Sequence, residues 1–158
     1  MFEIVNKKFL NDTVVMMDIK SPLVANKAKA GQFIILRATE DGERIPLTVA
    51  GTDPKNGTVN IIFQVVGATT EILKHKEVGD TIADFVGPLG NATEIEGIED
   101  AIVVGGGVGS AIALPVARAL KAQGTKVTSV VGFRNKDLVI LEDEFKSISD
   151  EFVLTTDD

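Results

Sequence analysis

The chain has 158 residues, of which 44% are hydrophobic and 25% are charged, and its formal net charge is −7. This composition supports a core in one domain or two small ones. The negative balance disfavours nucleic acids and anionic membranes as partners, because both require clustered cations. The absence of cysteine excludes disulfides, thiol catalysis and cysteine-ligated metal centres within the chain, and the single histidine, His75, predicts an exposed side chain rather than a triad or a metal site. No signal peptide and no apolar run of about 20 residues is found, so we expect a cytoplasmic protein that does not enter the membrane.

The first part of the chain predicts a small antiparallel β-barrel. Short runs of alternating apolar and polar residues are separated by turns rich in Gly, Asn, Asp and Pro. Val15, Met17 and Ile19 share one face of the second run, while residues 59, 61, 63 and 65 form the apolar face of the fifth. The predicted strands cover residues 2–10, 12–20, 32–38, 45–51, 58–66 and 80–86, with a polar connector at 27–31, a short helix at 69–76 and a turn at 87–90.

An acidic connector at residues 91–100 separates this part from an alternation of strands and helices. Strands are predicted at 101–104, 126–133 and 151–155, with a helix reaching about Lys121 and another at 139–145. Such alternation favours a partial, doubly wound parallel sheet, so we expect two domains, 1–97 and 98–158. An exposed edge of a parallel sheet is usually covered. The sheet is therefore expected to be completed by a longer chain, by another chain or by a homo-oligomer formed through the open edge.

Four glycines stand within five residues between the strand at 101–104 and the helix after it. Such a turn presents backbone N–H groups at a helix N-terminus, where an anion is stabilised, and glycine lets a diphosphate approach the backbone. The match to the pattern G-x-G-x-x-G is partial, because Ser110 occupies its last position. A close strand–helix turn without a ligand is the alternative. We favour the ligand, since each additional glycine costs about 0.5–1 kcal/mol relative to alanine in regular structure.

Several motifs, in order along the whole chain, resemble the ferredoxin–NADP reductase superfamily. Within it, the similarity is to the electron-transfer subunits of dihydroorotate dehydrogenase, sulfide dehydrogenase and NADH-dependent ferredoxin–NADP oxidoreductase. The motifs are AGQF (30–33), RIPLT (44–48), QVVGATT (64–70), GPLG (87–90), GGGVG (105–109) and GFRNKDL (132–138). The resemblance implies a barrel that binds FAD, followed by a domain that binds NAD(P).

The resemblance also assigns the flavin site. Arg44 would bind the flavin diphosphate, which suits a guanidinium because it is always charged and can bind phosphate bidentately; a solvated turn arginine beside Glu43 is the alternative. Pro46, Leu47 and Thr48 would follow the edge of the flavin ring, with Thr48 nearest the reactive N5 as the catalytic position. Thr48 as an ordinary strand residue remains the alternative.

The remaining flavin contacts come from the motif at 64–70. Gly67, Thr69 and Thr70 would bind phosphate at the start of the short helix, where either threonine could equally be a plain N-cap. Val65 and Val66 of the same motif are included among the cofactor contacts.

In the second domain, Gly106, Gly107, Val108 and Gly109 would approach the pyridine nucleotide. Arg134 follows the second strand of this domain, where an arginine tolerates the 2′-phosphate of NADP and an acidic residue would favour NAD; a plain surface charge is the alternative.

The chain departs from the family in three places. It has no Tyr or Trp, and Leu47 stands where many of these reductases place a tyrosine against the flavin. It lacks the cysteines that hold the family's [2Fe–2S] centre. The closing TTDD at 155–158 resembles the beginning of a family segment near the nicotinamide, so we expect an incomplete NAD(P) site.

The first functional hypothesis is an FAD-dependent NAD(P)H oxidoreductase component, a flavoprotein electron-transfer module. FAD would exchange a hydride with NAD(P)H and single electrons with an iron–sulfur partner or a larger oxidoreductase subunit, so the protein needs no acid–base dyad of its own. The alternative is a non-catalytic flavin- or nucleotide-binding regulatory or scaffold subunit, and a nucleotide-binding module without flavin is a third hypothesis.

Overall fold

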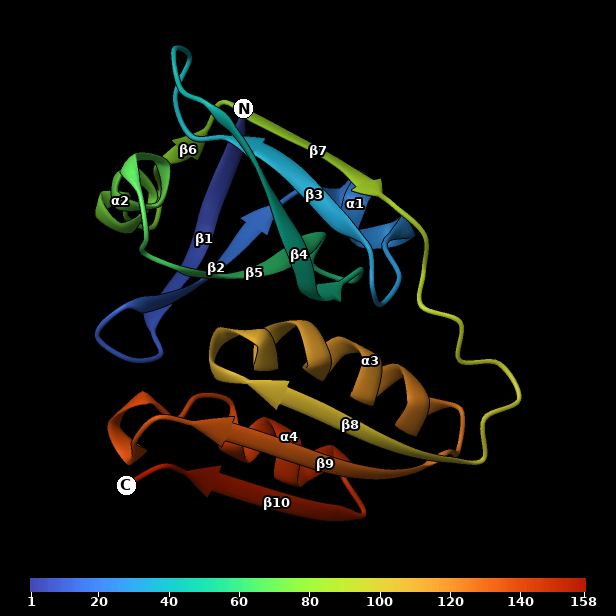
Figure 1. The fold of residues 1–158 in the computed structure, drawn as a ribbon. Coiled ribbons are helices and arrows are strands. Elements are labelled where there is room, and N and C mark those ends of the chain that lie inside the picture. Colours follow the sequence, from blue (N-terminus) through green and yellow to red (C-terminus); the bar gives the residue numbers. More distant parts are fainter. The chain divides into compact units, whose positions relative to one another are not determined.

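The computed structural model describes residues 1–158 and divides them into two compact units, Met1–Ala92 and Thr93–Asp158. The first unit runs from blue to green in Figure 1, and the second from yellow to red. Residues 90–99 contain no helix or strand. The expected boundary between residues 97 and 98 falls in the same connector, five residues after the division at 92. None of the helices has the length and apolar character needed to span a membrane.

The first unit is one antiparallel sheet of seven strands in the order β6-β1-β2-β5-β4-β3-β7, curved into a nearly closed barrel (Figure 1). Its elements are β1 (Phe2–Phe9), β2 (Val14–Lys20), α1 (Pro22–Lys27), β3 (Phe33–Arg37), β4 (Arg44–Asp53), β5 (Thr58–Gln64), α2 (Ala68–His75), β6 (Thr81–Ile82) and β7 (Asp84–Leu89). The predicted apolar faces are confirmed, since Val15, Met17 and Ile19 on β2 are fully buried and pair across the sheet with β5. The barrel core therefore forms where period-two alternation predicted it.

Two segments of this unit differ from the prediction. Residues 22–27, expected to lie outside regular structure, form α1, whose first position is Pro22 and whose buried side chains are Val24 and Ala25. Proline ends a strand but also suits the first turn of a helix, where its missing N–H costs nothing. The predicted strand 80–86 is two strands, and β7 continues through the expected turn to Leu89.

The second unit is a three-stranded parallel sheet in the order β10-β9-β8, with two α-helices. Its elements are β8 (Asp100–Gly106), the 3₁₀ turn η1 (Gly107–Gly109), α3 (Ser110–Ala122), β9 (Lys126–Phe133), η2 (Lys136–Leu138), α4 (Glu142–Ile148) and β10 (Glu151–Thr156). This confirms the partial α/β fold. The helix expected at 139–145 begins and ends three residues later, because Leu141 adopts a left-handed φ of 62° at its N-cap.

One face of this sheet is covered and the other is open. Val103, Val127 and Val131 lie buried on the side of the helices, while Ile102 and Val104 of β8 are each 70% exposed. β8 and β10 are both edge strands. α3 runs through Pro115 without ending.

Candidate functional site

The predicted residues of β4 lie on two opposite faces of the strand. Ile45 and Leu47 are partly buried and pack against the barrel core. Arg44 and Pro46 are exposed, and Thr48 shares their side of the strand because side chains alternate along it. Arg44, Pro46 and Thr48 therefore form one surface, and Leu47 belongs to another.

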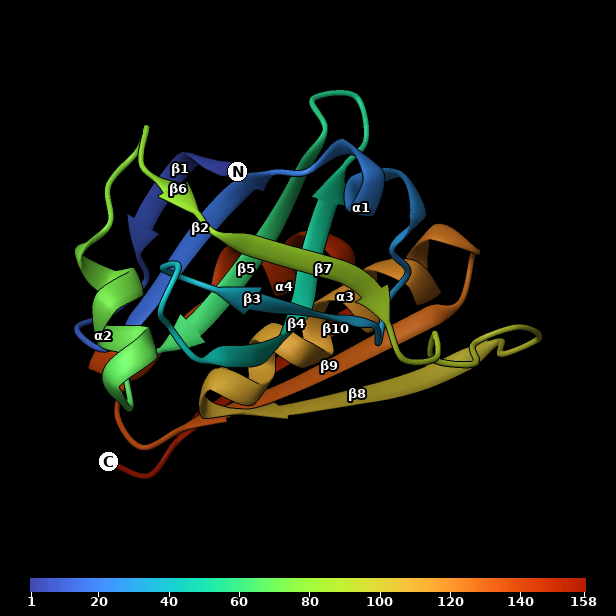
Figure 2. The ribbon, with the colours of Figure 1, turned by 90° about the horizontal axis from the view of Figure 1, so that it is seen from above.

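The outer surface of β4 continues across β3 to β7, which run side by side in Figure 2. Arg44 and Asp84 both pair in register with Arg37 of β3. One carboxylate oxygen, Asp84 Oδ2, lies 2.8 Å from Arg37 Nε and 3.2 Å from Arg44 Nη2. Arg37 and Asp84 form a close ion pair, but the Arg37 N–H at Nε does not point at the carboxylate as a hydrogen bond requires. Arg37 also donates a hydrogen bond from its guanidinium to the carbonyl of Glu40.

Asp84 is the only partner of the Arg44 guanidinium, and the side chain of Arg44 is 62% exposed. Its remaining N–H groups are free to bind an anion. Sequence reasoning missed Asp84 and Arg37, because only the register of three strands brings them to Arg44.

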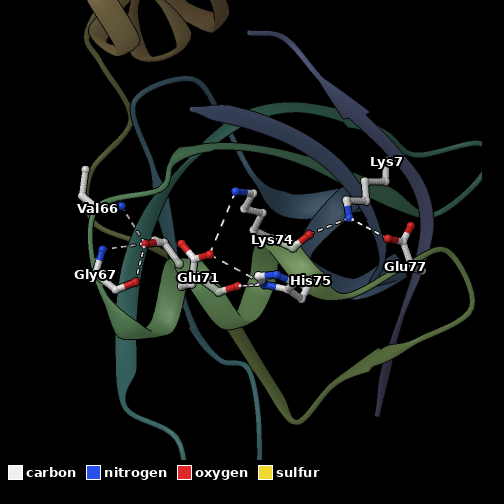
Figure 3. Close-up of polar contacts among 8 residues, drawn as sticks. Lys7, Val66, Gly67, Glu71, Lys74, His75 and Glu77 are labelled. Atoms are coloured by element: carbon white, nitrogen blue, oxygen red, sulfur yellow. Dashed lines mark hydrogen bonds and ion pairs between the residues drawn. The ribbon is translucent and has the colours of Figure 1, made fainter. Parts of the chain in front are cut away.

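Gly67 and Thr70 organise the start of α2 (Figure 3). The Thr70 hydroxyl accepts hydrogen bonds from the N–H groups of Val66 (2.9 Å) and Gly67 (3.0 Å), and donates one to the carbonyl of Gly67 (3.0 Å). The N-cap is Gly67 and Thr70 stands at N3, so the alternative that either threonine is a plain N-cap is wrong; the Thr70 hydroxyl is occupied because it bonds back to the N-cap residue. The first N–H groups of the helix itself have no acceptor within it. They lie beside Gly67, where an added Cβ would meet no atom within 4 Å.

An apolar rim runs next to this helix start. Val65 is partly buried against the same core as Ile45 and Leu47, whereas Val66 is 76% exposed. Thr69 is buried and its hydroxyl makes no hydrogen bond within the chain. Gly67 follows the exposed Val66 directly, so the free N–H groups at the start of α2 adjoin an exposed apolar side chain. His75, at the other end of α2, is exposed as expected.

The glycine turn of the second unit divides into two roles. A Cβ on Gly105 would lie 2.9 Å from Ser110 Cα, so this glycine allows α3 to pack closely on β8. An added Cβ at Gly106, Gly107 or Gly109 would meet nothing within 4 Å. The interpretation as a close strand–helix turn therefore applies to Gly105. The interpretation as a ligand site applies to Gly106, Gly107 and Gly109, which have open space beside them.

Arg134 stands at the same carboxyl edge of the parallel sheet. Gly106 of β8 pairs in register with Gly132 of β9, and Arg134 follows two residues later. Arg134 is exposed and makes no ion pair, although the N–H of Asp157 donates to its carbonyl. The structure brings Arg134 together with the turn at Gly106–Gly109, at the edge where open α/β sheets bind ligands. No three His, Cys, Asp or Glu side chains gather in a group that could hold a metal ion.

The chain is similar in sequence to known proteins over most of its length. No family model matches the chain. The chain is 50% identical over 155 residues to a dihydroorotate dehydrogenase B (NAD⁺) electron transfer subunit homologue from Thermotoga maritima, covering 98% of this chain and 55% of the relative. It is 38% identical over 135 residues to the corresponding electron transfer subunit of Streptococcus pneumoniae strain R6, covering 82% of this chain and 52% of that protein. The chain spans about half the length of these relatives.

Solved structures agree with the sequence comparison. An NADH-dependent reduced ferredoxin–NADP oxidoreductase, studied for flavin-based electron bifurcation, superposes with a TM-score of 0.94 at 49% identity, over 99% of this chain and 57% of that one. A cytochrome P450 reductase from Amycolatopsis shares the fold with a TM-score of 0.80 at 21% identity, over 97% of this chain and 49% of that one. The resemblance inferred from the motifs is confirmed over nearly the whole chain.

Proposed function

We propose that this chain is the FAD- and NAD(P)-binding part of an electron-transfer subunit, passing electrons between NAD(P)H and an iron–sulfur partner or a larger oxidoreductase subunit. The names of the relatives support this oxidoreductase role. The observation that carries it is the start of α2, where free N–H groups adjoin the open space at Gly67 and the exposed apolar side chain of Val66. A flavin dinucleotide requires that combination of anion site and apolar surface.

The residues present fit both cofactors. Gly67 in the first unit and Gly106, Gly107 and Gly109 in the second leave room beside helix N-termini. Bound FAD would supply the hydride and single-electron chemistry. The N–H groups after Gly67 would bind phosphate, and Val65, Val66 and Thr69 would border the ring. Leu47, on the core side of β4, would lie beneath the surface that the ring contacts.

The surface of Arg44, Pro46 and Thr48 completes the proposed flavin site. The Thr48 hydroxyl makes no hydrogen bond within the chain and is proposed to bond the ring edge. Arg44 is proposed to bind the diphosphate through the N–H groups that Asp84 leaves free.

In the second unit, Gly106, Gly107, Val108 and Gly109 are proposed to hold the nucleotide diphosphate, and Arg134 to accept the 2′-phosphate of NADP. We further propose a cytoplasmic protein of two functional domains, in which the open sheet edge pairs with further polypeptide or a second copy.

The test is the visible absorbance spectrum of the purified protein, recorded with added FAD and then under anaerobic NADH or NADPH. A bound flavin that either nucleotide bleaches supports the proposal. A bound flavin that neither bleaches favours the regulatory or scaffold alternative, and failure to bind FAD refutes the flavin assignment.

Gly67→Ser sharpens this test. The φ of Gly67 is −168°, which any residue adopts, and a serine at this N-cap would bond the free N–H groups that we assign to phosphate. FAD affinity should fall by roughly tenfold, as for the loss of one charge-assisted hydrogen bond, while thermal stability is kept or raised. Gly106→Ala is the matched control, since it should lower NAD(P)H affinity and leave FAD binding unchanged.

A further inference from the structure

The helix α2 is held on the barrel at few points. It has eight residues, and Leu73 is its only fully buried apolar side chain. A helix of this length is not stable in water by itself. Its position therefore depends on polar contacts at its two ends, of which Thr70 provides the N-terminal set.

Lys7 of β1 provides the contact at the C-terminal end (Figure 3). Its Nζ donates to the carbonyl of Lys74 in the last turn of α2 (2.6 Å) and to Glu77 Oε1 just beyond it (3.1 Å). Lys76, the C-cap residue of α2, adds a second link, since its Nζ donates to the carbonyl of Thr81 in β6 (2.9 Å). Only 7% of the Lys7 side chain is exposed, and Nζ lies 5.2 Å from the centre of the Phe9 ring.

The chemistry of this contact fixes the helix end strongly. An ammonium at a helix C-terminus is stabilised by the macrodipole. It also donates to the carbonyls of the last turn, which accept no hydrogen bond from an N–H group of the helix. Because Lys7 is nearly buried, its charge must keep both partners to offset the loss of water. The strand β1 thereby determines where the last turn of α2 lies.

We propose that Lys7 is a positioning residue for the phosphate site at the start of α2. It touches no ligand. It holds the far end of a short helix, so that the N–H groups after Gly67 keep the direction that an anion requires. The proposal rests on the flavin site proposed above and adds a residue to it that lies outside every motif of the resemblance.

The experiment compares two ligands that differ in phosphate. FAD carries the diphosphate that α2 would bind, and riboflavin carries the same ring without it. Affinities of wild-type protein, Lys7→Met, Lys7→Arg and Lys20→Met are measured by flavin fluorescence. Circular dichroism selects a temperature at which all four are folded. Lys20 is the matched control, because its Nζ also donates to a backbone carbonyl, that of Asn56 in the turn between β4 and β5, and makes no contact with α2.

Lys7→Met should weaken FAD by roughly tenfold, the size of one lost hydrogen bond to a charged group, and leave riboflavin unchanged. Lys7→Arg should keep the FAD affinity of the wild type, and Lys20→Met should change the affinity for neither ligand. An equal loss of both ligands, or no loss of FAD, would overturn the positioning role. Failure of the wild-type protein to bind FAD would instead refute the proposed function, and the positioning role with it.

Discussion

Replacing Gly105 by alanine tests the packing of α3 on β8 directly. The added Cβ would lie 2.9 Å from Ser110 Cα, 3.0 Å from Ser110 Oγ and 3.4 Å from Ala113 Cβ. Carbon atoms in contact prefer about 3.5–4.0 Å, and the closest atom belongs to the backbone, so no side-chain rotation relieves the overlap. The first turn of α3 must move away from the strand.

Overpacking of this kind costs typically about 1–3 kcal/mol. With a urea m-value of about 1–3 kcal/mol/M, the unfolding midpoint of the second unit should fall by about 1 M. Because the chain has no Trp or Tyr, far-ultraviolet circular dichroism is the appropriate signal.

Gly106→Ala is the control one residue away. Gly106 has a φ of −126° and open space around an added Cβ. The unfolding free energy of the Gly106→Ala variant should stay within about 0.5 kcal/mol of the wild-type value, the range of ordinary surface substitutions. Equal destabilisation of the two variants, or full stability of Gly105→Ala, would refute the division of the turn into a packing glycine and open glycines.

Three further changes follow from single contacts. Ser110→Ala should raise the unfolding free energy by about 1 kcal/mol in the same urea assay, because its hydroxyl is fully buried without a hydrogen-bond partner; a destabilised variant would contradict this. Thr70→Val should lower the melting temperature by the equivalent of about 1 kcal/mol, whereas Thr70→Ser should keep it, since only serine retains the cap. Hydrogen bonds from the side chain of Lys121 and the backbone of Val127 lower the pKa of Asp150 from its ordinary 3.8. That stabilisation is complete above the ordinary value and is lost as pH falls through the lowered one. Asp150→Asn should remove this part of the acid dependence of the melting temperature, and an unchanged acid profile would refute the assignment.

The parts of the fold predicted from the sequence are those with a long periodic signal. In strands β2 and β5 every second residue of one face is apolar, so a single register places that face, such as Val15, Met17 and Ile19 of β2, in the core. Helix α1 has six residues and buries only Val24 and Ala25, which is too short a pattern to distinguish from a connector. Pro22 is compatible with both the end of a strand and the start of a helix. Tertiary packing therefore decides which of the two forms.

For the candidate site, local patterns located the turns but not the side-chain directions. The resemblance assigned Pro46, Leu47 and Thr48 to the flavin without saying on which side of β4 each lies, although the sequence contains the alternation in which Ile45, Leu47 and Val49 are the apolar members. The link between Lys7 and Lys74, in contrast, spans 67 positions and has no local signal. Contacts of that kind depend on the closed order of strands, which no short window specifies.

The two proposed phosphate sites differ in how each first turn uses its hydroxyl. In α2, the Thr70 hydroxyl accepts hydrogen bonds from the N–H groups of Val66 and Gly67. The N–H groups left free to bind a ligand are therefore those of the helix itself. In α3, the Ser110 hydroxyl faces β8 and makes no hydrogen bond, so it takes up no N–H group of the turn Gly107–Gly109. A phosphate at the start of α2 would therefore depend on the N–H groups of the helix alone, whereas one at α3 would meet a turn whose hydroxyl does not compete with it.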